Sequence, residues 1–259
     1  DTSELKTIKE AMMRIEVNTC IRFRRRRSEA DYIDIQNENN RGCYTSVGRL
    51  NGRSVLMLEA NSENTCVVIQ IVQHELLHVI GLWHEHMRYD RDRYVRVNFR
   101  NIRPGFRSQF DIISSKDSTV FNIPYDYTSV MHYGKTAFAL PGTITMQTLD
   151  SRYTDVIGRQ TDASISDYQK VCNIYGCGVC NRRRMNSISN ARTDLWKPKL
   201  MPNDSSPDEE CSEKLSRLCG ALKQIGALDC NYEYATRYCS ATCNAETVRE
   251  SGDSVSVLK

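Results

Sequence analysis

Three histidines are spaced so that they could hold a single metal ion, and a glycine lies between the second and the third. In IQIVQHELLHVIGLWHEH (69–86), His74 and His78 are four residues apart, so on a helix they lie one turn apart on the same face. Gly81 could end that helix in a left-handed turn, from which His84 could return to the same ion. Three imidazoles leave one coordination position for water, which is typical of a catalytic zinc site.

Glu75, next to the first histidine, indicates what that water would do. A zinc ion makes bound water acidic enough to supply a hydroxide-like nucleophile at neutral pH, and it polarises a carbonyl. A carboxylate within hydrogen-bond reach could take the water proton and later hand it to a leaving amine. The pattern therefore predicts metal-assisted hydrolysis of a peptide bond, with Glu75 as the general base.

Ordinary core histidines are the alternative interpretation of this stretch. All five positions of the pattern HExxHxxGxxH are filled, and three buried imidazoles without a ligand would be left unsatisfied. Metal binding is therefore favoured. His86 does not fit the spacing, so we expect it at the surface or beside the ligands, because a site with three histidines needs room for water.

Hydrophobic periodicity predicts the elements that position this motif. Helical spacing is found in three segments, the first with Ser3 as a possible cap, and short β-branched or aromatic runs predict three strands. The helices are expected at 3–19, 65–80 and 164–176, and the strands at 20–23, 31–36 and 54–60. Beyond Trp83 the chain is irregular until the last helix. The expected fold class is α+β, with a helix-and-sheet half followed by a loop-rich half.

Composition excludes several classes of protein. The chain has 259 residues, of which 40% are hydrophobic and 26% charged, as in an ordinary globular protein. It contains no run of about 18 uncharged apolar residues, so no membrane span is expected. The net charge of +3 gives no reason to expect a nucleic-acid partner.

Eleven cysteines favour an oxidising compartment and disulfides, so we expect a secreted protein whose signal peptide has been removed or is not part of this sequence. Asn203 begins a glycosylation sequon in a polar stretch. Seven cysteines crowd into the last third of the chain, on either side of a polar stretch. The expected organisation is a main domain (1–180), a linker (181–210), a cysteine-rich module (211–245) that needs its disulfides to fold, and a disordered tail (246–259).

Two motifs resemble one family. HELLHVIGLWHE (74–85) is similar to the extended zinc signature of the astacin metallopeptidases, a branch of the metzincins, and SVMHY (129–133) resembles their Met-turn. The resemblance implies that Met131 lies beneath the zinc. It also implies that Tyr133 ligates zinc at rest and swings away to stabilise the oxyanion. Plain core packing is the alternative for both residues.

The resemblance covers about residues 4–176 and implies a two-lobed domain, with a twisted mixed sheet and the zinc helix in the amino-terminal lobe. Protein or peptide substrate would lie extended in the cleft and pair with an edge strand, for which we expect 54–60. The family's two bridges imply Cys20–Cys172 and Cys43–Cys66. Sequence alone leaves the three possible pairings of these four cysteines open.

The resemblance also implies a zymogen, in whose mature form a buried amino terminus is linked to Glu85. The resemblance places a strand before the first helix, and the sequence begins too close to that helix to contain it. We therefore expect that the sequence is a fragment or that the link is absent, and a solvated loop charge is the alternative for Glu85. The tail cysteines resemble a ShK-type toxin-like module, which has six cysteines where five are present. Cys177 or Cys180 could supply the sixth, and a zinc knuckle at these two is a further alternative.

Two functions follow from these features. The first is a secreted zinc-dependent endopeptidase acting on extracellular or dietary proteins, favoured by the complete histidine triad and Glu75. The second is a catalytically silent binding or toxin-like protein that acts through its cysteine-rich tail.

Overall fold

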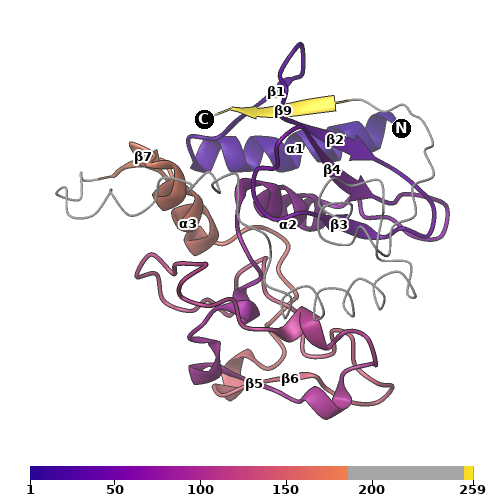
Figure 1. Ribbon diagram of the computed structural model, residues 1–259, viewed down its shortest axis with the longest axis vertical. Helices are drawn as coiled ribbons and strands as arrows, with labels where there is room; N and C mark the ends of the chain where they lie inside the picture. The colour runs from indigo at the N-terminus through magenta and orange to yellow at the C-terminus, as the bar shows by residue number, and fades with distance from the viewer. Residues whose placement is uncertain (186–253, 259) are drawn as a thin grey trace, which may run out of the picture. The chain divides into compact units, whose positions relative to one another are not determined.

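The computed structural model describes residues 1–185 and the backbone of 254–258 (Figure 1). The predicted α+β class is confirmed. The longer helices are α1 (Thr2–Asn18), α2 (Ile69–Ile80) and α3 (Ile165–Tyr175). The strands are β1 (Arg22–Arg25), β2 (Tyr32–Gln36), β3 (Cys43–Thr45), β4 (Arg53–Leu58), β5 (Val95–Val97), β6 (Met146–Thr148), β7 (Val179–Cys180), β8 (Arg183–Arg184) and β9 (Ser254–Leu258). No helix among these residues is long and apolar enough to cross a membrane.

The five-stranded sheet has the order β1-β9-β2-β4-β3. Strand β4 is parallel to β2 on one side and antiparallel to β3 on the other, and its residues 54–58 are buried. The expectation that 54–60 forms the edge is therefore wrong. On this side of the sheet the edge strand is β3, whose three residues CYT carry too little apolar pattern to be predicted as a strand.

The last described segment is a strand. β9 lies between β1 and β2 and is antiparallel to both. The expectation of disorder over 246–259 is therefore wrong for 254–258. Its sequence SVSVL alternates serine with β-branched valine, which suits a strand. Asn203, most of the expected linker and the cysteine-rich module lie outside the described residues.

Helices α1 and α2 share one core with the sheet (Figure 1). Ala11 and Ile15 of α1 and Leu76 and Leu77 of α2 are fully buried in it. The side chain of Asp1 caps α1 by accepting a hydrogen bond from the Glu4 amide, so the expected Ser3 cap is wrong. Most residues of α2 from Val72 to Ile80 are buried, including the polar side chains of Gln73, Glu75 and His78.

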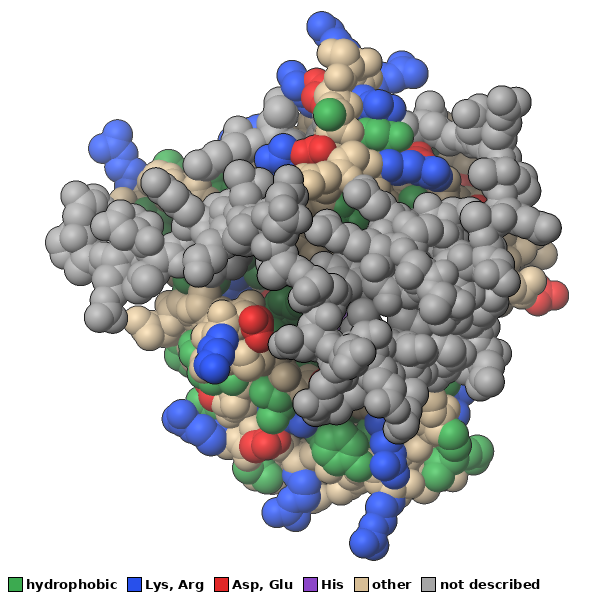
Figure 2. Space-filling view, viewed as in Figure 1, with side chains coloured by type: hydrophobic (Ala, Val, Ile, Leu, Met, Phe, Trp, Pro, Cys, Tyr) green, Lys and Arg blue, Asp and Glu red, His purple; other side chains and the backbone are tan. Residues whose placement is uncertain are grey.

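The loop-rich half after α2 has its own core. Between α2 and α3 the chain forms five short 3₁₀ helices and one two-stranded pairing, β5 with β6. The buried residues of this core are Val95, Ile102, Phe110, Tyr125, Met146 and Ile157. Charged side chains of both signs are spread over the described surface seen in Figure 2, as the small net charge implies.

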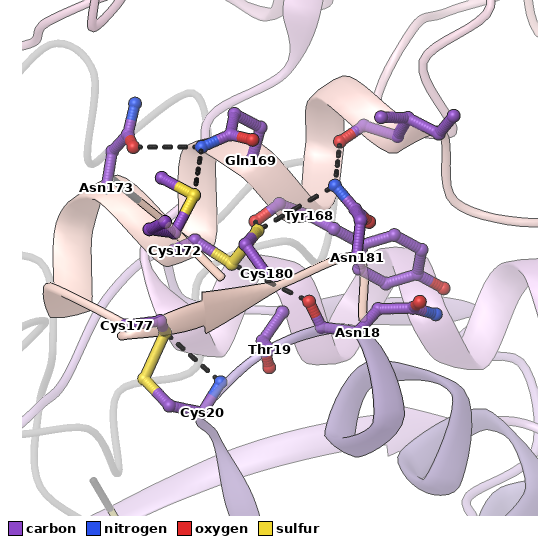
Figure 3. Close-up of a disulfide and its surroundings, with 12 residues drawn as sticks. Asn18, Thr19, Cys20, Tyr168, Gln169, Cys172, Asn173, Cys177, Cys180 and Asn181 are labelled. Atoms are coloured by element: carbon purple, nitrogen blue, oxygen red, sulfur yellow. Dashed lines mark hydrogen bonds between the residues drawn. A yellow bond between two sulfur atoms is a disulfide. The ribbon is translucent and has the colours of Figure 1, made fainter. Parts of the chain in front are cut away.

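The disulfides differ in part from expectation. Cys43 is bonded to Cys66, but Cys20 pairs with Cys177, so the expected Cys20–Cys172 bridge is wrong (Figure 3). Gly176 ends α3 in a left-handed conformation, and Cys177 follows it directly. Within α3, Cys172 instead pairs with Cys180.

The bonding of Cys177 and Cys180 contradicts the zinc knuckle, and it also contradicts their pairing with tail cysteines. Strand β7, which contains Cys180, pairs with β8 in a hairpin. The first residues of the expected linker are therefore held against the main domain.

Candidate metal centre

Three imidazoles converge at one end of α2. The Nε2 atom of His84 lies 3.1 Å from that of His74 and 3.2 Å from that of His78. Tetrahedral zinc with bonds of about 2.0–2.1 Å to nitrogen requires ligand atoms roughly 3.3 Å apart. The three side chains can therefore hold one metal ion.

Backbone carbonyls orient two of these rings. The Nδ1–H of His74 donates to the carbonyl of Val130 at 2.8 Å, and that of His78 donates to Leu82 at 2.7 Å. With the proton assigned to Nδ1, each Nε2 presents a lone pair to the shared centre. Burial lowers the pKa of His78 to about 3 and also lowers the pKa of His74 and His84. The triad is therefore neutral, which is the form that binds metal.

Gly81 makes the turn that returns the chain to this centre. Its φ of 119° lies in the left-handed region. Its amide bonds to the carbonyls of Leu77 and His78, and the Leu82 amide bonds to Leu77 at 2.9 Å. This is a glycine-terminated helix end of the Schellman type. Because α2 stops here, His84 can approach from the opposite side of the centre.

Glu75 has a carboxylate oxygen without a partner. Its side chain is 6% exposed, and Oε2 is buried without a hydrogen bond from the described residues. Burial raises the pKa of Glu75 to about 8. Leaving such a group unsatisfied is costly, so the orphaned oxygen indicates a site built for a further polar occupant. A water molecule at the metal would be such an occupant.

This carboxylate predicts how the metal-free protein responds to pH. An acid whose pKa is raised from 4.5 to about 8 by folding binds more protons when folded, so its contribution to stability is lost as pH rises through that window. Metal-free Glu75→Gln is therefore expected to be more stable than metal-free wild type at pH 8, by on the order of a few kcal/mol. Urea unfolding with a chelator present, repeated down to pH 4.5, should show the difference closing. A difference that stays constant with pH would contradict the assignment.

Tyr133 lies against the ring of His84 and contacts His86 and Gln109. Its ring is 4.4 Å from that of His84 and stacks at 4.2 Å on His86. Its hydroxyl donates to the side-chain oxygen of Gln109 at 3.3 Å, while the Nε2 of His86 bonds to the Gln109 carbonyl. Of the two positions expected for His86, the structure therefore has the one beside the ligands, because this residue is fully buried.

Gly158 permits a close backbone approach next to Tyr133. A Cβ at this position would lie 2.2 Å from the Gly134 nitrogen and 2.9 Å from the Tyr133 carbonyl carbon, and its φ is +70°. Gly158→Ala is expected to cost about 2–4 kcal/mol of unfolding free energy and to lower kcat by displacing Tyr133. Urea unfolding and peptide hydrolysis measure the two effects.

Gly142→Ala is the matched control, since Gly142 has a φ of +73° but nothing near its Cβ position. It should cost only about 1 kcal/mol and leave kcat unchanged. Equal effects of the two substitutions would mean that backbone strain, and not the close approach, explains Gly158.

The Met-turn segment contacts the chain on both sides of the centre, at His74 and at the residue after His84. Met131 is fully buried, and its carbonyl accepts the Glu85 amide at 2.9 Å. Glu85 is 2% exposed, so the alternative of a solvated loop charge is wrong. Its carboxylate is held by Lys170, by Arg88 and by the amide of Asp126. The link to a buried amino terminus stays a prediction.

Several residues that contact the centre or its neighbours were not predicted from the sequence. Val130 acts through its carbonyl, which no side-chain pattern reveals. Gln109 is a neutral residue in the loop-rich half, where no periodicity marks it. Asp167 and Lys170 were expected only as helical residues of 164–176; Asp167 at the third position after Ser164 is typical of a capping box and so gave no sign of a further role.

Comparison with known proteins agrees with this geometry. The profile of Astacin (Peptidase family M12A) matches residues 1–176. Zinc metalloproteinase nas-5 of Caenorhabditis elegans is 44% identical over 248 residues, which are 95% of this chain and 68% of that protein. Human meprin A subunit beta is 43% identical over 85% of this chain and 27% of its own length. The solved structure of high choriolytic enzyme 1, a hatching enzyme zinc-protease from the medaka Oryzias latipes, matches with a TM-score of 0.62 and 35% identity, covering 68% of this chain and 84% of that one. This chain belongs to the astacin family of zinc metalloendopeptidases, whose members use one catalytic zinc ion.

Proposed function

We propose that this chain is a secreted endopeptidase that cleaves extended segments of extracellular or dietary proteins. His74, His78 and His84 would hold the zinc, and Glu75 would act as the general base. The observation that carries this proposal is the unpartnered, buried Oε2 of Glu75 beside three converging imidazoles. This oxygen makes no hydrogen bond that would stabilise the described fold, but it could accept a proton from a metal-bound water.

Zinc, when bound, supplies Lewis acidity, which polarises the scissile carbonyl and acidifies water. Proton transfer is the task of Glu75. Its unpartnered oxygen can accept a proton from the attacking water and then deliver it to the leaving amine nitrogen. Its pKa is raised by burial, and a nearby cation would lower it again, so the group can move between both protonation states.

Tyr133 is the proposed donor to the developing oxyanion. Burial raises the pKa of its hydroxyl, so the group stays protonated and can donate. In the structure its hydroxyl donates to Gln109 at 3.3 Å, which is a long hydrogen bond and is readily exchanged, and ligation of zinc at rest stays a prediction. Stacking on His86 limits the directions in which the ring can move.

The substrate would pair with β3 at the edge of the sheet. An extended peptide that adds a strand gains backbone hydrogen bonds with little demand on its sequence. The loop after β3 is joined to the metal helix, because the Gly48 amide donates to the His78 carbonyl at 2.8 Å. A peptide on this edge would therefore be held at a fixed position relative to α2.

Secretion is proposed because of the bonded cysteines. Six cysteines of the described residues form three disulfides, a density that suits an oxidising compartment. The cysteines, and not the similarity to other proteins, carry this part of the proposal. Glycosylation at Asn203 and synthesis as a zymogen are part of the same proposal.

Hydrolysis of a denatured, carboxymethylated protein by the activated full chain tests this proposal. Cleavage is expected, should stop with 1,10-phenanthroline, and should return when zinc is added after the chelator is removed. Cleavage that survives chelation would contradict the zinc mechanism. Complete absence of cleavage by a zinc-loaded chain would favour the silent binding protein that acts through its tail.

A further inference from the structure

We propose that Asp167 and Lys170, one turn apart on α3, are positioning residues that hold the zinc ligands His74 and His84 in place. The inference rests on the proposed role of the histidines as ligands. It concerns how α3, about ninety residues after the metal helix, reaches the centre through two chains of polar contacts. Neither residue belongs to the HExxH pattern or to the Met-turn.

The first chain of contacts runs from Asp167 to His74. The Asp167 carboxylate is fully buried and accepts the Ser129 hydroxyl at 2.6 Å and the Val130 amide at 3.0 Å. The carbonyl of the same Val130 accepts the Nδ1–H of His74 at 2.8 Å. Asp167 therefore fixes the residue whose carbonyl sets the orientation of the first ligand. Such partners of metal-bound histidines tune both ring position and basicity.

The second chain runs from Lys170 to His84. The Lys170 ammonium is ion-paired with Oε2 of Glu85, and their side chains are 10% and 3% exposed. Glu85 follows His84 directly, and its amide donates to the Met131 carbonyl at 2.9 Å. Glu85 is thus held through both its backbone and its carboxylate. The peptide that carries the third ligand has little freedom to move.

The two chains share one cation. Nζ of Lys170 lies 3.8 Å from Asp167 and also pairs with Glu85, so it stands between two buried carboxylates. Arg88 also contacts Glu85, but its guanidinium is bidentate to Asp90 as well. Loss of the Lys170 charge would leave Glu85 and Asp167 facing each other without their common counter-ion. Uncompensated charges in a protein interior are costly and force local rearrangement.

The docking of α3 does not depend on this ion pair. The Cys20–Cys177 bridge anchors the end of the helix, and Cys172–Cys180 ties it to β7. The Tyr175 hydroxyl also donates to the Ile80 carbonyl of α2 at 2.9 Å. A substitution at Lys170 should therefore disturb the ligands while the helix stays in place. This separates a positioning role from a merely structural one.

Zinc affinity of the full chain, measured by competition with a chromogenic chelator, tests the proposal. Lys170→Met keeps the length of the side chain and removes its charge, and it is expected to weaken zinc binding about 10–100-fold. Lys170→Arg should restore most of the affinity. Arg24→Met is the matched control, because Arg24 is an exposed residue of β1, at the sheet edge opposite β3, and forms an ion pair with Glu29. It should bind zinc as the wild type does.

Circular dichroism of each variant verifies that it is folded. If Lys170→Met does not fold, the double variant Glu85→Gln/Lys170→Met, which removes both charges, is measured in its place. This double variant should still bind zinc less tightly than wild type. Wild-type zinc affinity in a folded Lys170→Met would overturn the proposal, and so would wild-type affinity in the double variant if that variant has to be used. The proposal would also be overturned if Lys170→Arg bound zinc no more tightly than Lys170→Met. Failure of the wild type itself to bind zinc would instead overturn the proposed function.

Discussion

Glu75→Gln is expected to lower kcat/KM for a denatured protein substrate by about two to four orders of magnitude, the range that general acid–base catalysis supplies. Glutamine has nearly the same size, but its amide cannot take up a proton from water at neutral pH. The three imidazoles are untouched, so the variant should still bind zinc. Initial rates and metal content, measured on the same preparations, give both quantities.

Glu63→Gln is the matched control, since Glu63 is an exposed glutamate in the loop before α2. It should retain the wild-type rate. A zinc-loaded Glu75→Gln that also retained the wild-type rate would show that another group moves the proton. Loss of zinc from Glu75→Gln would show that the carboxylate is a ligand and not a base.

The second large effect is expected from His78→Ala. Two imidazoles remain, too few for a site with three protein ligands, so both bound zinc and proteolysis should be lost. Stability should lose its response to the metal as well. A wild-type chain at free zinc about 1,000-fold above its Kd gains about 4 kcal/mol of unfolding free energy, and His78→Ala should gain none. Thermal unfolding with and without zinc measures this gain.

His86→Ala separates the ligands from their neighbours. This residue is fully buried and its ring is 5.4 Å from that of His84, but we do not assign it to the metal. Its substitution should leave the zinc-dependent stabilisation in place while weakening the support of Tyr133. If His86→Ala lost the response to zinc as completely as His78→Ala, the assignment of ligands would be wrong.

Local spacing was sufficient to predict the core of the centre. His74, Glu75 and His78 share one helical turn, and Gly81 must follow the helix end for His84 to return. Each of these relations spans fewer than a dozen residues, so periodicity and backbone conformation settle it. Helix α3 was likewise expected at 164–176 from its periodicity, and in the structure Ser164 and Gly176 cap its two ends.

Relations between distant segments could not be predicted in the same way. Which strand lies at the edge depends on the order of pairing, and β4 is internal only because β3 pairs with it. Cys172 and Cys177 are five residues apart, so spacing alone could not decide which one meets Cys20. The partner of Glu85 is 85 residues away at Lys170. Burial and charge neutrality required some cation there, but they did not specify which one.

X-ray absorption at the zinc edge of the wild-type chain tests the central claim most directly. Three imidazole nitrogens at about 2.0–2.1 Å are expected, with oxygen in the remaining positions and no sulfur. His78→Ala should then give no zinc signal of this kind. A sulfur ligand at about 2.3 Å, or fewer than three imidazoles in the wild type, would contradict a catalytic centre built from His74, His78 and His84.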